Sequence, residues 1–218
     1  MLETLSANRR FIITGLLVLF SLGFLGLFNE SDALSPVFQS VIISIVFFLV
    51  IPLLYSKIVL EESLKNLGLQ RGNMSAGVLT GIVCVLIALA IVITLMLNFP
   101  DFRAGYAFPF VVETSFVWFI LYELLLVPLV LLLDEVFFRG LVQLLWLRAY
   151  GIWAVFVQAA LFSGFLYLTD DISWSRAPAL IFCLFAGFIA YRSQSIWYSF
   201  AASFAFLFLT DVLMLAFR

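Results

Sequence analysis

The chain has 218 residues, of which 65% are hydrophobic and 11% are charged. A soluble domain is roughly 45–50% apolar and about 25% charged, so the composition excludes a water-soluble globule. The formal net charge is −2, and no basic patch indicates a nucleic-acid partner. The sequence contains no histidine, which excludes any chemistry that needs imidazole as base, acid or metal ligand.

Apolar stretches extend along the chain from residue 11 to residue 217. About 20 apolar residues cross a bilayer as a helix. Strands of a membrane barrel alternate apolar and polar residues, whereas the run Val41–Leu54 does not. The sequence therefore predicts an all-α polytopic bundle of about eight transmembrane helices, with seven as the alternative. Residues 1–218 are expected to form a single integral-membrane domain in the lipid bilayer.

Four spans are expected in the first part of the chain, namely Phe11–Phe28, Pro36–Ser56, Met74–Asn98 and Phe110–Leu133. Arg9 and Arg10 precede the first span, and the loop after the second carries Lys57, Lys65 and Arg71. Basic residues gather on the cytoplasmic side, which predicts a cytoplasmic N-terminus in a multi-pass protein of a bacterial-type cytoplasmic membrane. No A-x-A site follows the first apolar run, so we interpret it as a retained helix rather than a signal peptide.

Two arrangements of the second part of the chain remain open. In one, Asp134–Tyr150 lies along the cytoplasmic surface and the chain has seven spans. In the other, Glu135–Tyr150 itself crosses and gives eight. The spans that follow are the same in both: Ile152–Leu168, Ala177–Tyr191 and Ile196–Phe217. Both arrangements place the same number of basic residues inside, so the positive-inside rule does not distinguish them.

Charged residues within apolar runs are functional candidates, because a charge inside the hydrocarbon layer is costly. Glu135 and Arg139 are four residues apart with the acid first, the favourable order for an ion pair on a helix. Such a pair is either structural or a catalytic carboxylate that activates water and is held by an arginine. Glu123 lies eleven residues before Asp134, which places both on one helix face. We expect Glu123 to point into the bundle and find a hydrogen-bond partner.

Other polar residues are expected to serve packing. Gln158 and Thr210 are predicted to form hydrogen bonds between helices. Cys84 and Cys183 each lie inside an apolar run and are interpreted as small packing residues rather than a disulfide or metal pair. Gly77 and Gly81 form a G-x-x-x-G spacing, which indicates a close approach of two helices.

The run from Asp134 to Gly140, D-E-V-F-F-R-G, resembles the E-E-x-x-x-R signature of the CPBP family. This family comprises the type II CAAX prenyl endopeptidases and their bacterial relatives, including proteins like lysostaphin resistance protein A and bacteriocin-immunity proteins. The segment 160–167, A-L-F-S-G-F-L-Y, resembles the second motif, F-x-x-x-H. The segment 187–197 is similar to the G-x-x-x-x-R…S-I-W turn before the third motif, H-x-x-x-N. The resemblance covers residues 110–217.

The chain departs from the family pattern at the residues that carry its chemistry. The first glutamate is Asp134, the second-motif histidine is Leu166, and the third-motif histidine and asparagine are Ser203 and Leu207. In the family, the glutamate and two histidines are thought to assemble a water-activating site. Aliphatic side chains offer no lone pair, and a serine hydroxyl is a weak base and a poor ligand. The resemblance therefore implies a degenerate member with no metal and no cofactor, whose vestigial site consists of Glu135, Arg139 and Asp134.

The resemblance also favours one arrangement of the spans. A family-like site requires positions 135, 166 and 203 at one membrane depth. In the seven-span arrangement Glu135 is cytoplasmic and Leu166 nears the outer face, about 20 Å away at about 1.5 Å per residue. We therefore expect eight spans with both termini inside.

A cluster of acids is expected around this pocket. Asp170 follows Leu166 by about one helical turn, and Asp211 follows Leu207 by about one turn. Leu166 and Leu207 both occupy motif positions. With Asp134, Glu135 and Asp171 they would form an acidic rim. Such a rim would bind a hard cation or a basic peptide segment. In the alternative interpretation, these acids are interfacial charges that arginines balance.

Three functions are consistent with these residues. We favour a catalytically inactive membrane scaffold that binds a membrane-protein partner or a membrane-anchored peptide. The alternative is an intramembrane metallo- or glutamate endopeptidase of CAAX type. There Glu135 is the general base, Arg139 orients it, and Asp134 with Asp170 or Asp211 replaces the imidazoles. A third hypothesis is a small transporter in which Glu123 and Asp134 relay protons.

Overall fold

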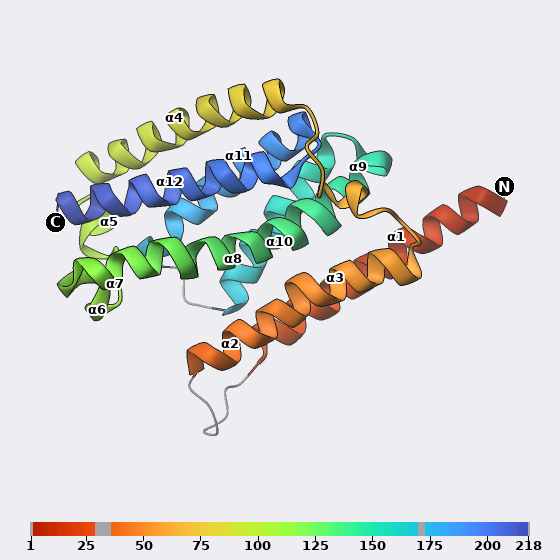
Figure 1. Cartoon of the computed structure of the whole chain (residues 1–218), viewed down its shortest axis with the longest axis horizontal. Helices are drawn as coiled ribbons and strands as arrows, with labels where there is room; N and C mark the ends of the chain where they lie inside the picture. Colours follow the sequence, from red (N-terminus) through yellow and green to blue (C-terminus); the bar gives the residue numbers. More distant parts are fainter. Residues whose placement is uncertain (1, 29–35, 170–172, 218) are drawn as a thin grey trace.

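The computed structural model describes residues 2–28, 36–169 and 173–217, and the described residues form helices without any strand. Two long helices at the N-terminal side pack as an antiparallel pair (Figure 1). The bounds are α1 (Leu2–Gly26), α2 (Pro36–Ile45), η1 (Val46–Val50), α3 (Ile51–Leu54) and η2 (Tyr55–Val59). The last four are one continuous helix. Thr14 and Tyr55 join the pair through a hydroxyl–hydroxyl contact of 2.9 Å.

A single long helix follows the loop that contains η3 (Leu64–Leu67). It is α4 (Met74–Asn98), which begins where the Asn73 side chain accepts a hydrogen bond from the Ala76 N–H. A Cβ on Gly77 would lie 2.5 Å from the Tyr198 ring of α12. The predicted close approach at the glycine pair is therefore confirmed. The short helices α5 (Pro100–Ala104) and α6 (Phe110–Thr114) follow it.

The next helix runs without interruption through the charged motif. It comprises α7 (Phe116–Leu121), η4 (Tyr122–Leu126), α8 (Val127–Asp134), η5 (Glu135–Leu144) and α9 (Leu145–Tyr150). Ser115 has extended backbone angles, so this span starts later than residue 110. The π-helical turn η4 ends immediately before Val127 and Pro128, as suits a proline that has no N–H to donate.

Three helices complete the bundle. They are α10 (Trp153–Thr169), α11 (Ala177–Ser193), which follows the short η6 (Trp174–Arg176), and α12 (Ile196–Ala216). The turn between α11 and α12 is tight: Gln194 has a φ of 55° and the Ser195 side chain accepts a hydrogen bond from the Trp197 N–H. Helices α11 and α12 pack on each other and on α4.

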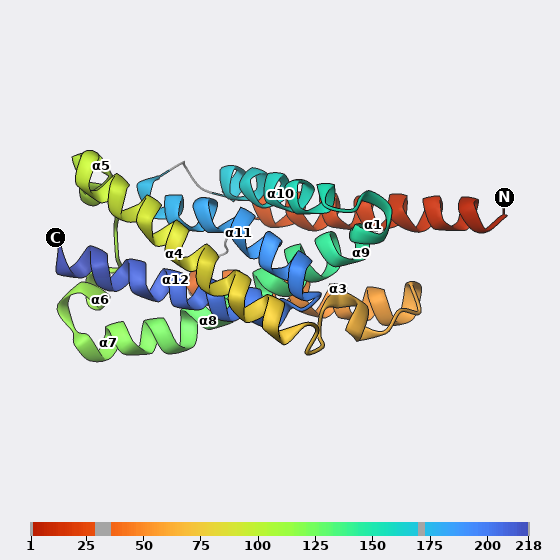
Figure 2. The same ribbon diagram turned by 90° about the horizontal axis from the view of Figure 1, so that it is seen from above.

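The described residues confirm a polytopic helical bundle. Five of their helices are long and apolar enough to span a membrane, and Arg10–Gly26 and Trp153–Thr169 are shorter apolar helices. The segment 135–150 is not a separate crossing, because Phe116–Leu147 is one helix. The N- and C-terminal ends of the chain lie at opposite ends of the bundle (Figures 1 and 2), so the expectation of both termini on one side was wrong. We call these the N-terminal end and the C-terminal end of the bundle.

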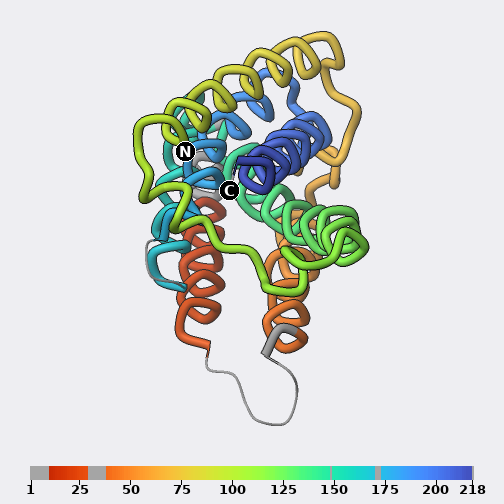
Figure 3. The backbone as a smooth tube through the Cα atoms, turned by 90° about the vertical axis from the view of Figure 1, so that its left-hand side faces the viewer, coloured from red at the N-terminus to blue at the C-terminus, as the bar shows by residue number. Residues whose placement is uncertain are grey.

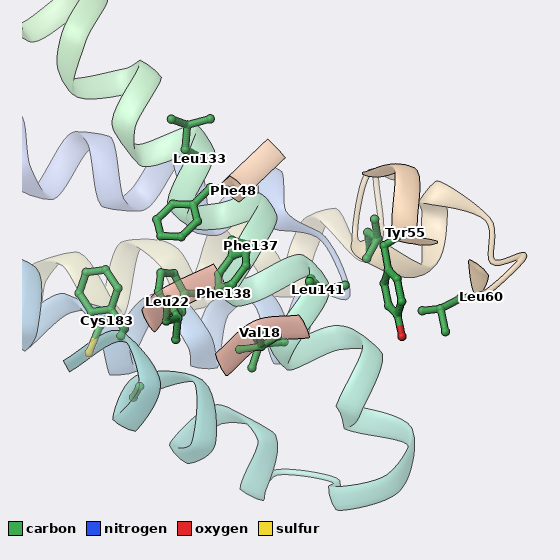
Figure 4. Packing of buried hydrophobic residues seen from close by; sticks show 14 residues of the cluster. Val18, Leu22, Phe48, Tyr55, Leu60, Leu133, Phe137, Phe138, Leu141 and Cys183 are labelled. Atoms are coloured by element: carbon green, nitrogen blue, oxygen red, sulfur yellow. The ribbon is translucent and has the colours of Figure 1, made fainter. Parts of the chain in front are cut away.

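One packed core lies between the N-terminal pair and the helix 116–150, and a second lies between α4, α11 and α12. Seen along the bundle, α1 and the α2–α3 helix form a layer beside the remaining helices (Figure 3). Phe48 stacks on Phe137 with ring centroids 4.6 Å apart (Figure 4). Phe138 meets the Phe162 ring edge-on at 5.1 Å. In lipid such contacts stabilise by close packing rather than by removal from water. They fix η5, the segment that carries the charged motif, against α10.

Candidate active site

Glu135 is the centre of the buried polar cluster in η5, and its side chain is 1% exposed. Ser199 Oγ donates to its Oε2 at 2.5 Å, and Ser203 Oγ donates to its Oε1 at 3.2 Å. Both serines lie on α12, one helical turn apart. The helix facing η5 therefore satisfies both carboxylate oxygens with hydroxyl donors.

Arg139 supplies the opposite charge. Its Nε lies 3.7 Å from Glu135 Oε1, which confirms the predicted ion pair. The Nε atom makes no hydrogen bond within the described residues, so the contact is one of charge rather than a hydrogen bond. The guanidinium also lies 5.4 Å from the centre of the Phe162 ring, close enough for a cation–π interaction.

The segment that carries this cluster is a buried π-helix. All ten residues of η5 are buried and adopt a π-helical hydrogen-bond pattern, which occurs mostly as single turns and often at functional sites. Gly140 lets the η3 loop approach, because a Cβ there would lie 2.9 Å from the Leu67 carbonyl oxygen. The charged motif is thus held between the loop, α10 and α12.

A partly open cavity of about 280 Å³ adjoins the cluster, and we call it the internal cavity because it lies between the helices of the bundle. It brings together most of the positions that the sequence singled out, namely Asp134, Arg139, Leu166, Ser203, Leu207 and Asp211. The bundle therefore brings these positions together around one cavity, and Glu135 lies buried beside them. Asp170 and Asp171 lie outside the described residues, and the full acidic rim remains a prediction.

Glu135 itself is absent from this cavity's lining among the described residues. Its carboxylate lies behind Ser203 and Arg139, which do line the cavity. Leu166 and Leu207 present hydrocarbon where a ligand or base would be needed. Among the described residues, no three His, Cys, Asp or Glu side chains converge as ligands for a metal ion. The groups present therefore do not fit a family-type metal site.

Glu123 belongs to a different cluster. It is fully buried within the bundle, as expected. The group that interacts with it is the Asp211 carboxyl rather than Asp134. Asp211 in turn accepts a hydrogen bond from the Tyr106 hydroxyl. Burial, and then the nearby Asp211 charge, raise the pKa of Tyr106, which lies between α5 and α6.

The remaining predictions for polar residues and cysteines have different outcomes. Gln158 joins α10 to α11, because its Nε2 donates to the Cys183 carbonyl at 3.0 Å. Thr210 has no hydrogen-bond partner within the described residues, so its predicted interhelical bond was wrong. Cys84 and Cys183 are both free and buried, as expected of packing residues.

Sequence reasoning missed Ser199 and Tyr106. A signal for Ser199 existed, because polar residues recur at four-residue intervals from the N-cap Ser195 into α12: Ser199, Ser203 and, after Leu207, Asp211. Tyr106 had no local signal, since it reaches Asp211 from 105 residues away in the sequence.

Comparison with known families agrees with this geometry. A family model described as type II CAAX prenyl endopeptidase Rce1-like matches residues 113–209. The matched residues make up somewhat less than half of the chain. Comparisons with curated proteins and with solved structures gave no match. The Rce1-like segment contains the helix 116–150, α10, α11 and most of α12, and so includes Glu135, Arg139 and every residue named above as lining the cavity except Asp211.

The protein is thus a CAAX-protease-like, multi-pass membrane protein. Its Rce1-like segment contains the Glu135–Arg139 ion pair, and the sequence contains no histidine. The N-terminal pair and α4, which precede the match, pack around this segment.

Proposed function

We propose that this Rce1-like protein binds a membrane-anchored peptide in its internal cavity and does not cleave it. One observation carries the proposal: the chain has a cavity beside the charged motif, while Glu135, the carboxylate that would act as base, is buried and does not line it. A general base must reach the proton it removes directly or through one water. Glu135 instead has Ser199, Ser203 and Arg139 as partners.

A lateral groove supports a membrane-anchored ligand. The groove has a volume of about 620 Å³ and runs between α1, α2, α8 and α10. Apolar side chains such as Val41, Phe48 and Phe165 line it. It shares Asp134 and Leu166 with the internal cavity. An apolar chain attached to a peptide therefore has a continuous surface that leads to the site.

One observation favours an active enzyme as the second candidate. Asp134 and Asp211 line the same cavity as Ser203, and carboxylates can serve as acid and base. In that case substrate would be cleaved with the two aspartates in place of the family's imidazoles. Loss of turnover in Asp134→Asn or Asp211→Asn would identify this mechanism.

Binding is tested with a fluorescent prenylated peptide and the purified protein in lipid nanodiscs. Leu207→Trp fills the cavity and is expected to weaken binding at least tenfold. Leu209→Trp, on the same helix and 41% exposed, is the matched control and is expected to bind as the wild type does. Equal binding by the two variants would contradict the proposed site.

A further inference from the structure

An open apolar groove of about 310 Å³ lies between α4 and α12. Small residues of both helices line it, and the larger side chains beside them on α4 are exposed, with Ile82 at 56% and Leu86 at 63%. Among the described residues it shares none of its lining with the internal cavity. We call it the α4–α12 groove. Its small residues are Gly77, Gly81, Ala201, Ala202 and Ala205.

The length of the groove corresponds to one leaflet of a bilayer. Its lining extends along α4 from Gly77 to Leu86, which is about 14 Å at about 1.5 Å per residue. Half of the hydrocarbon core of a bilayer is about 15 Å thick. The Gly77 end lies toward the N-terminal end of the bundle, where α4 starts beside the turn between α11 and α12 (Figure 1).

Two arginines lie at the Gly77 end of the groove. Arg71 precedes Asn73 by two residues, and the Asn73 N–H donates to the Ser193 carbonyl at 2.8 Å. Arg192 immediately precedes Ser193. A Cβ on Gly77 would lie 3.0 Å from Ser193 Cβ, so this backbone contact borders the groove. Both arginines are exposed, and no hydrogen bond or ion pair joins either guanidinium to another described residue.

Aromatic side chains indicate the depth of these arginines in the membrane. Trp197, in the first turn of α12, is 45% exposed, and Tyr191 lies near the end of α11. Tryptophan and tyrosine are enriched at the level of the lipid headgroups. The two arginines therefore lie at headgroup depth, while the groove continues from them into the hydrocarbon region.

The occupant of the groove must be apolar along its length and anionic at one end. A small-residue groove lets an apolar chain approach two helix backbones closely, and basic pockets between transmembrane helices bind anionic headgroups. We propose that the α4–α12 groove binds one anionic phospholipid, with an acyl chain along the small residues and its phosphate between Arg71 and Arg192. The lipid would join α4 to α12, the helix that faces Glu135.

Native mass spectrometry of the delipidated full chain tests the headgroup site, with phosphatidylglycerol and phosphatidylcholine of equal acyl chains as probes. The wild type is expected to bind one phosphatidylglycerol about tenfold or more tightly than phosphatidylcholine, since each surface arginine favours an anionic headgroup by about fivefold. Arg71→Gln combined with Arg192→Gln is expected to lose this preference. Lys57→Gln combined with Lys65→Gln removes the same charge from exposed positions in η2 and η3 and is expected to keep it.

The apolar part of the site is tested separately. Ala201→Phe fills the groove from an exposed position and is expected to weaken binding of both lipids by about tenfold. Val83→Phe, on α4 at a position 46% exposed and outside the groove lining, is the matched control and is expected to bind as the wild type does.

Four results would overturn the proposal. They are a wild type without preference for phosphatidylglycerol, an equal loss of preference in the arginine and lysine variants, unchanged binding by Ala201→Phe, and a lipid-free dimer that Ala201→Phe dissociates, which would assign the groove to a second copy of the chain. The arginine and lysine variants change exposed side chains only, so they test the site even if Ala201→Phe does not fold.

Discussion

Two glutamates on one helix have opposite surroundings. Glu135 receives hydrogen bonds from Ser199 and Ser203 and pairs with Arg139. Glu123, twelve residues earlier on the same helix, has another carboxyl as its partner. Both are buried to within 1%. The comparison shows that the partners of a buried acid depend on the helix that faces it, since α12 presents two hydroxyls to Glu135 and a carboxyl to Glu123.

The same substitution at the two positions tests this difference most strongly. Glu135→Gln leaves the Arg139 charge buried without its partner, which is expected to lower the free energy of unfolding by about 3–5 kcal/mol. Glu123→Gln removes an acid that forms no ion pair with a described residue, and its effect is expected to be under about 1 kcal/mol. Unfolding by SDS in mixed micelles measures both. Equal losses would mean that the two environments do not differ as described.

The hydroxyl donors of Glu135 provide a finer test. Ser199→Ala and Ser203→Ala each remove a hydrogen bond to a charged group, worth about 1.5–3 kcal/mol. The loss is expected to be larger at Ser199, whose bond is 2.5 Å against 3.2 Å. Ser173→Ala, at an exposed site, is the control and should change stability by less than about 0.5 kcal/mol. A larger loss at Ser203 than at Ser199 would contradict the geometry.

Two buried glutamine side chains test the packing of uncharged polar groups against α11. Gln143 and Gln158 donate to the Gly187 and Cys183 carbonyls of α11. A Cβ on Gly187 would lie 2.5 Å from Gln158 Nε2 and 3.0 Å from Gln143 Oε1, so Gly187→Ala is expected to cost about 1–3 kcal/mol.

Gly164→Ala is the control for that substitution. No atom lies within 4 Å of its added Cβ, and the higher helix propensity of alanine favours it by up to about 1 kcal/mol. Thermal unfolding of both variants provides the measurement. Stabilisation by Gly187→Ala would show that the glutamines have room to move.

The smallest effect is expected at the edge of the Glu123–Asp211 pair. Tyr106→Phe removes the hydroxyl that donates to Asp211, and the expected loss is about 0.5–1.5 kcal/mol. Phe108→Leu, which retains an apolar side chain beside Tyr106, controls for packing in the same connection. No loss on removal of the hydroxyl would mean that Asp211 does not depend on this donor.

Local patterns were sufficient for most helices but not for the turn at the charged motif. Met74–Asn98 was predicted with the bounds that α4 has, because caps and apolar length are local properties. The acids at 134 and 135 were interpreted as marking a membrane surface. In the structure Arg139, Ser199 and Ser203 compensate Glu135 inside the bundle, so the helix continues through them. That compensation depends on contacts with a helix more than 60 residues away.

The candidate site was predictable where spacing along one helix determines it. Glu135 and Arg139 pair as their four-residue spacing indicated. The position of Glu135 behind the cavity wall was not predictable, since it follows from how α12 packs on η5. The same holds for Glu123, which was expected to act with Asp134 on its own helix and instead meets Asp211 of α12.

Hydrolysis of a prenylated peptide, followed by mass spectrometry, tests the central claim that the cavity binds without cleaving. The wild type in nanodiscs is expected to release no more product than Glu135→Gln. The combined variant Leu166→His, Ser203→His and Leu207→Asn places imidazoles and an amide at the positions that resemble the family's motifs, and it is expected to release more product than the wild type. Product released by the wild type and abolished by Glu135→Gln would contradict the account.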